Sequence, residues 1–341
     1  MNNIAYKPVA SESEWEEFLS LHEEANFLQS WYFGEFHKRL GKHIQRTGFY
    51  KKDRLIGVML SVVEPARRGR YLTVAGGPIL DWQDTSLVDT VFKTMKAIAE
   101  EENCVFVRVR PQLLENEFSI DLFKRKGFNN ATMHLTAELT SRLAIEKSEE
   151  ELLVQMRKAT RYEIKKAIKE GIKIKTTTNP KDVKAFYDIQ LATAKRQHFV
   201  PFSYKFFLEQ FSVFFQAKRA LMYEAYLEKT LLAQAFIIFY GKEAVYHYGT
   251  GTEVGRKHPG AYLIQWEAIK EAKKRGMQWY NFWGIAPVNE PQHRFSGVSV
   301  FKRGFAGEDT QYLHAQDLVI NKLRYVFNYL VEWIRKKVRK V

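Results

Sequence analysis

The pattern of hydrophobic and polar positions is clearest between residues 245 and 284, where it predicts a strand, a loop, a helix and a second strand. Tyr246 and Tyr248 stand two residues apart in an aromatic run that two glycines end. A helical period follows and places apolar side chains on one face, namely Tyr262, Trp266, Ile269 and Ala272. Gly276 then ends the predicted helix, because glycine readily adopts the left-handed conformation of a helix cap.

The entrance of this predicted helix is a candidate anion site. Gly260 directly follows Pro259, and the first N–H groups of a helix lack internal partners and can hold an anion. Acyl-coenzyme A acetyltransferases use the same strand, loop, helix, strand unit, with a denser glycine pattern for the pyrophosphate than the single Gly260 here. The alternative interpretation is an ordinary crossover within an α/β core.

The same order of elements occurs twice along the 341 residues, a length that favours two domains. Each copy has a strand, a charged turn and a strand, then a strand that ends in glycines, then a helix and a closing strand. The matched segments are 49–57 and 225–233, 71–77 and 245–251, 87–101 and 261–274, and 105–109 and 278–282. Their separations are nearly equal, so we predict two copies of one α/β fold with mixed sheets. Coincidence is the alternative, because few residues are identical between the copies.

The segment between the copies has a basic stripe. A largely apolar face at helical spacing consists of Leu153, Met156, Thr160, Ile164 and Ile168, and Gly171 is placed to cap the helix. Beside this face lie Lys158, Arg161, Lys165 and Lys169. The stripe is either a solvated surface or a contact for the phosphate backbone of a nucleic acid. Two further helices are expected between residues 181 and 208, joined around Pro201.

The tail from 318 to 341 is predicted to be an amphipathic helix with a basic end. Its apolar positions are Val319, Leu323, Val326, Leu330 and Ile334. We expect this helix to pack on the first domain, with acidic lipid head groups as an additional contact.

A net charge of +14 implies an anionic partner such as nucleic acid, a phosphorylated substrate or an acidic membrane surface, unless it serves solubility alone. The longest apolar run, residues 231–240, is far shorter than the roughly 20 residues that span a bilayer, so no transmembrane helix is expected. The first residues have neither a basic start nor an apolar signal core, which predicts a cytoplasmic protein.

The sequence lacks the stronger catalytic motifs. It has no P-loop, dinucleotide fingerprint, HExxH, cysteine cluster or nucleophile elbow. The single cysteine, Cys104, lies in an apolar run and is interpreted as a buried structural thiol. We expect no metal, because several histidines have no ligand spacing and are interpreted as surface or core residues, namely His247, His258, His293 and His314.

Four segments together resemble the FemABX family of non-ribosomal peptidyltransferases: NFLQSWYFGEFHKRLG, MRKATRYEIKKAIKEGIKI, the run from HYGTG to YNFWG, and FKRGFAG. The resemblance implies two tandem acetyltransferase-like (GNAT-like) domains. The first is expected to comprise residues 1–143 with a returning C-terminal helix, 316–341, and the second residues 144–315. No long heptad pair interrupts the second domain, so the chain resembles the shorter, FemX-like branch of the family.

The resemblance implies an aminoacyltransferase that moves an amino acid from aminoacyl-tRNA to an amine of a peptidoglycan precursor, either lipid-linked or UDP-linked. This reaction needs an amine placed beside an ester, a cation for the developing oxyanion and sites for two polyanions. It implies no cofactor. We expect a cytoplasmic monomer, with peripheral contact to an acidic membrane surface as an addition, and the basic stripe is expected to bind the tRNA.

The resemblance also assigns roles to individual residues. Lys302 corresponds to the family lysine associated with the tRNA acceptor end and the oxyanion, and it is expected to have no buried partner. Lys38 and Arg196 lie near family positions that bind the diphosphate of the precursor. Aromatic residues are also expected at the substrate: Tyr246 or Tyr248 lies near the site tyrosine of the family, and Phe301 is expected beside them.

One residue departs from the family pattern. Where the family can place an aspartate in the strand before a proline, this chain has Arg110, so proton removal is expected to fall to the substrate or to water. Three alternatives stay open: an acetyltransferase that binds coenzyme A at Gly260, a non-catalytic protein that binds tRNA or the cell envelope, and a transferase of this family with an acceptor other than peptidoglycan.

Overall fold

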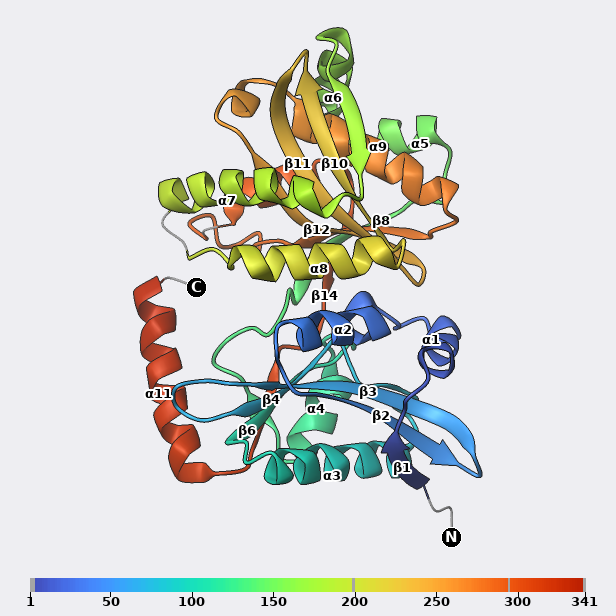
Figure 1. Ribbon diagram of the computed structural model, residues 1–341, viewed down its shortest axis with the longest axis vertical. Helices are drawn as coiled ribbons and strands as arrows, with labels where there is room; N and C mark the ends of the chain where they lie inside the picture. Colours follow the sequence, from blue (N-terminus) through green and yellow to red (C-terminus); the bar gives the residue numbers. More distant parts are fainter. Residues whose placement is uncertain (1–3, 198–199, 294, 340–341) are drawn as a thin grey trace. The chain divides into compact units, whose positions relative to one another are not determined.

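A computed structural model describes residues 4–197, 200–293 and 295–339. The chain forms two compact units (Figure 1). The first consists of Met1–Glu138 together with Thr310–Val341, and the second is Leu139–Asp309. The chain therefore leaves the first unit, completes the second, and returns to the first. Within the described residues, no helix combines the length and the apolar character needed to cross a bilayer.

The first unit has one mixed sheet with helices packed against it. The strand order is β1-β2-β3-β4-β6-β15-β7, and β5 pairs with β3 off this path. The bounds are β1 Ile4–Pro8, α1 Glu12–Ser20, α2 Trp31–Arg39, β2 Ile44–Lys51, β3 Arg54–Glu64, β4 Tyr71–Ala75, β5 Ile79–Leu80, α3 Thr85–Glu101, β6 Phe106–Arg110, α4 Glu117–Arg125, β7 Asn129–Asn130, β15 Gln316–Val319 and α11 Lys322–Arg339.

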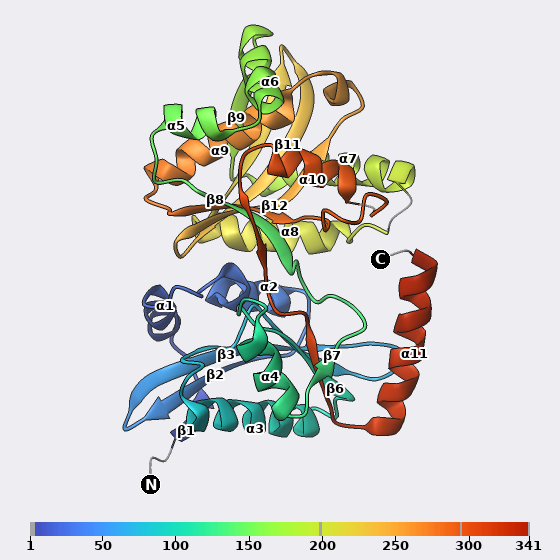
Figure 2. The same ribbon diagram turned by 180° about the vertical axis from the view of Figure 1, so that it is seen from behind.

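The second unit has a sheet of seven strands in the order β14-β8-β13-β12-β11-β10-β9. The bounds are β8 Leu139–Ala144, α5 Glu149–Gln155, α6 Lys158–Lys169, β9 Lys173–Thr177, α7 Val183–Gln197, α8 Tyr204–Gln216, β10 Ala220–Leu227, β11 Thr230–Tyr240, β12 Glu243–Gly251, α9 Gly260–Lys274, β13 Trp279–Gly284, α10 Ser296–Arg303 and β14 Glu308–Gln311. Figure 2 shows α10, which faces away from the viewer of Figure 1.

The two sheets repeat one topology. When the second is followed from β9, its fourth and fifth strands, β12 and β13, are parallel, as are β4 and β6 at the same positions of the first. Antiparallel ladders lead up to this pair in both sheets. The predicted repeat of a mixed α/β fold is therefore confirmed, and so are the helices expected at 87–101 and 261–274.

Apolar faces hold each helix on its sheet. In the first unit, α3 begins at the cap Asp84, whose side chain accepts the N–H of Leu87 at 3.0 Å, and it buries Val91 and Met95 against β6 and its neighbours. In the second unit, α9 buries one apolar face on β10 and β11. The predicted cap Gly276 has a φ of +75°, as a left-handed helix end requires.

The basic segment between the copies differs from the prediction. Two helices form instead of one, because the backbone at Met156 is extended and ends α5. Met156 and Ile164 are buried as expected, whereas Ile168 is exposed. Cys104 is a buried free thiol, and burial raises its pKa to about 11, which agrees with a structural role.

The C-terminal helix α11 packs on the first unit through polar side chains, not through its apolar face. Tyr325 donates from its hydroxyl to Asp317 at 2.9 Å, Asn328 accepts from Arg68 at 2.9 Å, and Glu332 accepts from Arg108 at 2.9 Å. The apolar positions that were expected to face the domain are exposed, namely Leu323, Val326, Leu330 and Ile334. Val319 belongs to β15 and precedes the helix.

A buried ion pair holds the returning strand β15 in the first sheet. Arg108 on β6 donates two hydrogen bonds to Asp317 on β15, at 2.7 and 2.8 Å, and both side chains are nearly inaccessible to solvent. Such a pair adds little net stability compared with apolar residues, but its loss leaves one charge buried without compensation. Strand β15 is thus held in the first sheet by a pair of charges, and removal of either partner alone is unfavourable.

We expect Asp317→Ala to lower the free energy of unfolding by about 3 to 5 kcal/mol, because the Arg108 guanidinium would lose its principal buried counter-ion. The matched control is Asp188→Ala, which removes the exposed Lys184–Asp188 pair of α7 and is expected to cost about 0.5 kcal/mol or less. Urea unfolding of both variants measures the difference, and equal destabilisation would contradict the role of the buried pair.

Candidate active site

The parallel strands β12 and β13 are paired at their beginnings only. Their ladder joins Glu243 to Trp279, Ala244 to Tyr280 and Val245 to Asn281. Among the described residues of these strands, no later pair joins them, since β12 continues along β11 and β13 along β8. The carboxyl ends of two adjacent parallel strands are a usual place for a ligand site in α/β proteins.

Lys302 reaches this place from α10. Its Nζ donates to the carbonyl oxygen of Gly284, at the end of β13, at 2.7 Å. The same Nζ lies 5.6 Å from the ring centroid of Tyr246 on β12. Lys302 is only 8% exposed, and burial lowers the pKa of its ammonium from 10.5 to about 7. Near neutral pH this side chain therefore exists both as a cation and as a neutral amine.

Three residues of α10 fix the end of β13 and the segment that follows it. Lys302 bonds to Gly284, the Ser299 hydroxyl accepts the N–H of Ala286 at 2.7 Å, and Arg303 donates to the carbonyl of Ala286 at 2.7 Å. Arg303 is itself held by Asp309 at 2.6 Å. These bonds fix the position of the Lys302 amine relative to the strand ends, as a catalytic group requires.

Trp283, the residue before Gly284, has a φ of +64°, which is unusual for a bulky side chain. The side chain of buried Asn281 accepts the N–H of Trp283 at 2.7 Å and so stabilises the turn. The ring of His247 meets the Trp283 ring edge to face, with centroids 5.3 Å apart. Burial and then the charge of Lys302 lower the pKa of His247 to about 3, so its imidazole is neutral. Backbone strain thus coincides with the buried lysine.

Tyr246 and Tyr248 do not share one face, although they stand at period two. Tyr246 is opposite Ile237 on β11 and Tyr248 is opposite Phe236, so His247 is an extra residue in a β-bulge. Tyr246 therefore packs with the cluster under α9, where burial raises its pKa to about 12. Tyr248 instead contacts Phe207 of α8, with ring centroids 5.2 Å apart. The structure brings Tyr246 to Lys302 and directs Tyr248 to the other side of the sheet.

Phe301 packs between aromatic residues of the second unit. Its ring lies 4.8 Å from that of Tyr262 on α9 and 5.4 Å from that of Phe305. These ring contacts hold α10 against α9. Packing alone therefore explains why residue 301 is aromatic. A contact of Phe301 with substrate stays a prediction.

The two residues expected at a diphosphate belong to different units. Lys38 is half exposed on α2 of the first unit and pairs with Glu35 at 3.0 Å, and Glu35 also binds Arg46. Arg196 is exposed near the end of α7 in the second unit. Their common role stays a prediction.

Arg110 is fully buried in the first unit. It donates to Thr136 at 2.6 Å and to Gln112 at 2.7 Å, and its guanidinium lies 5.3 Å from the ring of Tyr312. These contacts give it a structural role in the place where the family pattern allows an aspartate.

The predicted basic stripe is mostly available on α6. Lys158, Lys165 and Lys169 are exposed. Arg161 differs, because it donates to the carbonyl oxygens of Met156 and Val154, the latter at 2.9 Å, and so bridges α5 and α6. Three lysines therefore remain as the accessible part of the stripe.

Gly260 is explained by close packing. A Cβ at this position would lie 2.9 Å from the Cβ of Ala225 and 3.3 Å from that of Leu232, so glycine lets α9 start directly on the sheet. This close contact explains Gly260 as part of an ordinary helical crossover. It therefore favours that interpretation and not a coenzyme A site.

His314 has partners that its sequence position does not reveal. Its Nδ1 lies 2.7 Å from Glu138 Oε2, its Nε2 lies 2.8 Å from the carbonyl oxygen of Ala131, and His134 is 2.6 Å from the same carboxylate oxygen. Hydrogen bonds from both histidines lower the pKa of Glu138 to about 2 despite its burial. The three side chains could also hold a metal ion, and the expectation that this chain binds none stays a prediction.

Comparisons with known proteins agree with this geometry. The profile of the FemAB family matches residues 10–142, 126–229 and 216–332, which together span most of the chain. The chain belongs to the FemAB family. The family resemblance predicted from four sequence segments is thereby confirmed.

FemAB relatives and solved structures cover nearly the whole chain. The lipid II:glycine glycyltransferase of Staphylococcus haemolyticus (strain JCSC1435) is 20% identical over 403 residues, covering 96% of this chain and 95% of its own. Aminoacyltransferase FemA of Staphylococcus aureus (strain MRSA252) is 18% identical over 415 residues, covering 94% and 99%. The crystal structure of FemX has a TM-score of 0.85 at 16% identity and covers 96% and 100%. The relatives' names support a transferase.

A tandem GNAT protein from the clavulanic acid biosynthesis pathway shares the fold, with a TM-score of 0.59 at 10% identity, covering 93% of this chain and 98% of its own. The fold class of two tandem GNAT-like domains is therefore confirmed. At this identity the likeness concerns the fold alone.

Sequence reasoning did not single out Ser299, Arg303 or the bulged His247 as part of this candidate site. His247 and Arg303 lie in the segments HYGTG and FKRGFAG, but their roles depend on backbone groups or on residues of other elements. The signal that was present is the density of aromatic residues and glycines in HYGTG and YNFWG, which predicts two irregular strand ends.

The lowered pKa of Lys302 predicts how stability depends on pH. Between about 7 and 10.5 the unfolded chain binds this proton more tightly than the folded protein does, so the contribution of Lys302 to stability rises with pH. Lys302→Met binds no proton in either state. We therefore expect wild type to gain stability relative to Lys302→Met between pH 7 and pH 9.5.

The measurement is urea unfolding of both proteins at the two pH values, with Lys205→Met on α8 as the exposed control. Parallel pH dependence of wild type and Lys302→Met would show that the ammonium of Lys302 is not destabilised by burial.

Proposed function

We propose that this protein transfers an amino acid from aminoacyl-tRNA to the amine of a peptidoglycan-precursor stem peptide, with Lys302 at the reacting centre. The observation that carries the proposal is the buried amine of Lys302, which donates to Gly284 where β12 and β13 are no longer paired. Membership of the FemAB family and relatives named as lipid II:glycine glycyltransferase and aminoacyltransferase support it.

The proposed reaction is a direct displacement at the ester carbon. The acceptor amine forms the new C–N bond, the bond to the 3′ oxygen of the tRNA breaks, the amine loses a proton and the 3′ oxygen gains one. Protonated Lys302 would stabilise the oxyanion that develops at the tetrahedral carbon, since a preorganised cation in a dry site is far stronger than one in water. Tyr246 would form the adjoining wall, because its ring lies beside the ammonium.

We propose the lipid-linked precursor as the acceptor and the inner face of the membrane as the place of reaction. The names of the glycyltransferase relatives carry the choice of lipid II over a UDP-linked precursor. The exposed lysines of α6 are proposed to contact the tRNA backbone.

We expect Lys302→Met to lower the single-turnover rate of transfer by about 100 to 1000-fold, the usual loss for one oxyanion donor. Lys302→Arg should restore transfer only in part, because the planar guanidinium cannot donate to Gly284 as a compact ammonium does. The measurement follows label from charged tRNA into lipid-linked and UDP-linked precursors, with free coenzyme A as a competitor.

Folding must be followed beside activity, because Lys302 has a buried partner, contrary to the sequence-based expectation. Its removal leaves the Gly284 carbonyl without this donor, so thermal unfolding is measured for each variant. The matched control is Lys205→Met, expected to transfer at the wild-type rate. Near-normal transfer by folded Lys302→Met would refute its catalytic role, and inhibition by coenzyme A would favour the acetyltransferase alternative.

We expect tRNA binding to weaken steeply with salt, because lysines that contact phosphates release counter-ions. Lys165→Glu on α6 should weaken binding and reduce the slope of log affinity against log salt by about 1. The control Lys205→Glu makes the same charge change on α8, a helix on the other face of the sheet. Titration of labelled tRNA at several salt concentrations measures both, and identical behaviour of the two variants would exclude the α6 stripe.

A further inference from the structure

The C-terminal helix α11 turns its polar side toward the first unit and exposes its apolar side, the reverse of a helix that packs on a core. The side chains that bind the first unit are polar and stand at i, i+3 and i+7, namely Tyr325, Asn328 and Glu332. The opposite side carries a continuous apolar stripe, namely Leu323, Val326, Phe327, Leu330 and Ile334, each at least half exposed. A helix that exposes such a stripe leaves unsatisfied a large hydrophobic driving force for association.

Basic residues flank this stripe. Lys322 and Arg324 lie at the start of the helix and Arg335 and Lys336 follow its last apolar position, and all four are exposed. The only acidic residue between 322 and 336, Glu332, is turned inward to Arg108. The exposed side of α11 thus has apolar residues between basic ones and no acidic side chain. Such a surface is more complementary to the interface of an anionic lipid bilayer than to a protein surface, which carries charges of both signs.

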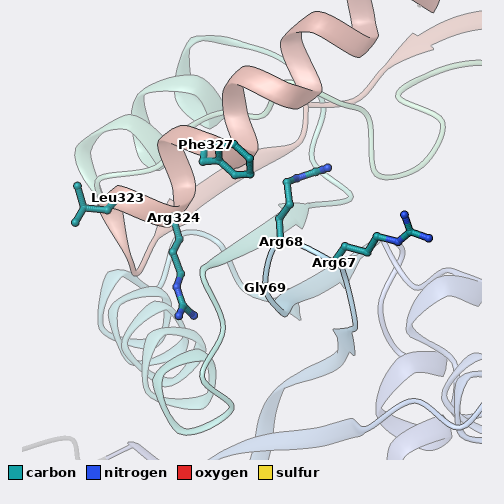
Figure 3. A pocket seen from close by; sticks show the side chains of 6 residues that line it. All are labelled: Arg67, Arg68, Gly69, Leu323, Arg324 and Phe327. Carbon is teal, nitrogen blue, oxygen red and sulfur yellow. The ribbon is translucent and has the colours of Figure 1, made fainter.

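A pocket joins the cations to the stripe (Figure 3). It has a volume of about 540 Å³ and is lined by two segments of the first unit, Arg67–Gly69 after β3 and the first turns of α11. Arg68 is held by Asn328, whereas Arg67 and Arg324 are exposed. Leu323 and Phe327 form the apolar part of the lining. Guanidinium groups beside aliphatic and aromatic side chains suit a phosphate that carries acyl chains.

We propose that α11 lies in the interface of a membrane that contains anionic phospholipid, with its apolar stripe among the acyl chains. Arg67 and Arg324, whose side chains point away from one another (Figure 3), would each contact a lipid phosphate. The helix would lie in the plane of the surface and not span it, which agrees with its basic residues and with the hydrogen bonds that keep its polar side on the first unit. This proposal refines the membrane location of the proposed acceptor, but the binding itself requires neither tRNA nor transfer.

The experiment is flotation of the full-length protein with vesicles of phosphatidylcholine, with and without phosphatidylglycerol. We expect binding to the anionic vesicles and roughly tenfold less to the neutral ones. Leu330→Glu should reduce binding at least tenfold, since it places a charge among acyl chains. Arg324→Glu should reduce it about as strongly on anionic vesicles only, because each cation near such a surface contributes about 1 kcal/mol and its reversal counts twice.

Matched controls separate this surface from general charge. Val154→Glu changes an exposed valine of α5, and Arg54→Glu changes an exposed arginine of β3, and both are expected to bind as wild type. Thermal unfolding of Leu330→Glu should be unchanged, because its side chain is not part of the packed face. The proposal would be overturned if the protein did not bind vesicles, or if it bound neutral and anionic vesicles equally. It would also be overturned if sedimentation showed a dimer that Leu330→Glu dissociates. Single-turnover transfer to a soluble precursor analogue tests the catalytic proposal independently.

Discussion

Burying the ammonium of Lys302 is unfavourable, and the local structure of the second unit is arranged to make it tolerable. The carbonyl of Gly284 accepts its hydrogen bond, and the ring of Tyr246 lies beside it. The carbonyl is available because β13 ends in an irregular turn at Trp283, and that turn is held by Asn281 and by α10. Burial still lowers the pKa of this ammonium to about 7, so the folded protein holds the proton less tightly than an exposed lysine would.

The repeat shows that this arrangement is a property of one copy. In the first unit, the parallel pair β4 and β6 stays paired through Ala75 and Arg110, the last residues of both strands. In the second unit the corresponding ladder ends at Val245 and Asn281, and a bulge at His247 turns the next residues of β12. One topology therefore supplies a closed sheet in one unit and two separated strand ends in the other.

The C-terminal elements β15 and α11 complete the first sheet and also expose an apolar stripe. Strand β15 completes the first sheet through the buried pair of Arg108 and Asp317, and the following helix is fastened by the same network through Glu332. Because polar bonds hold α11 in place, its apolar residues are released from packing and remain exposed.

The sequence by itself determined the elements that depend on neighbours along the chain. Helical and strand periods located α3 and α9, glycine ended α9, and the matched order of elements predicted two α/β copies, because periodicity and caps are local properties. The family resemblance of FKRGFAG also selected Lys302. Only the tertiary structure decided what depends on distant partners. The bulge that separates Tyr246 from Tyr248 exists because of pairing with β11, and Arg161 is occupied by carbonyls at the break between two helices. The apolar stripe of α11 faces outward because Arg68, Arg108 and Asp317, all distant in sequence or on another element, bind its polar side. Periodicity identifies two faces of a helix, but the direction that each faces is set by the partner it meets.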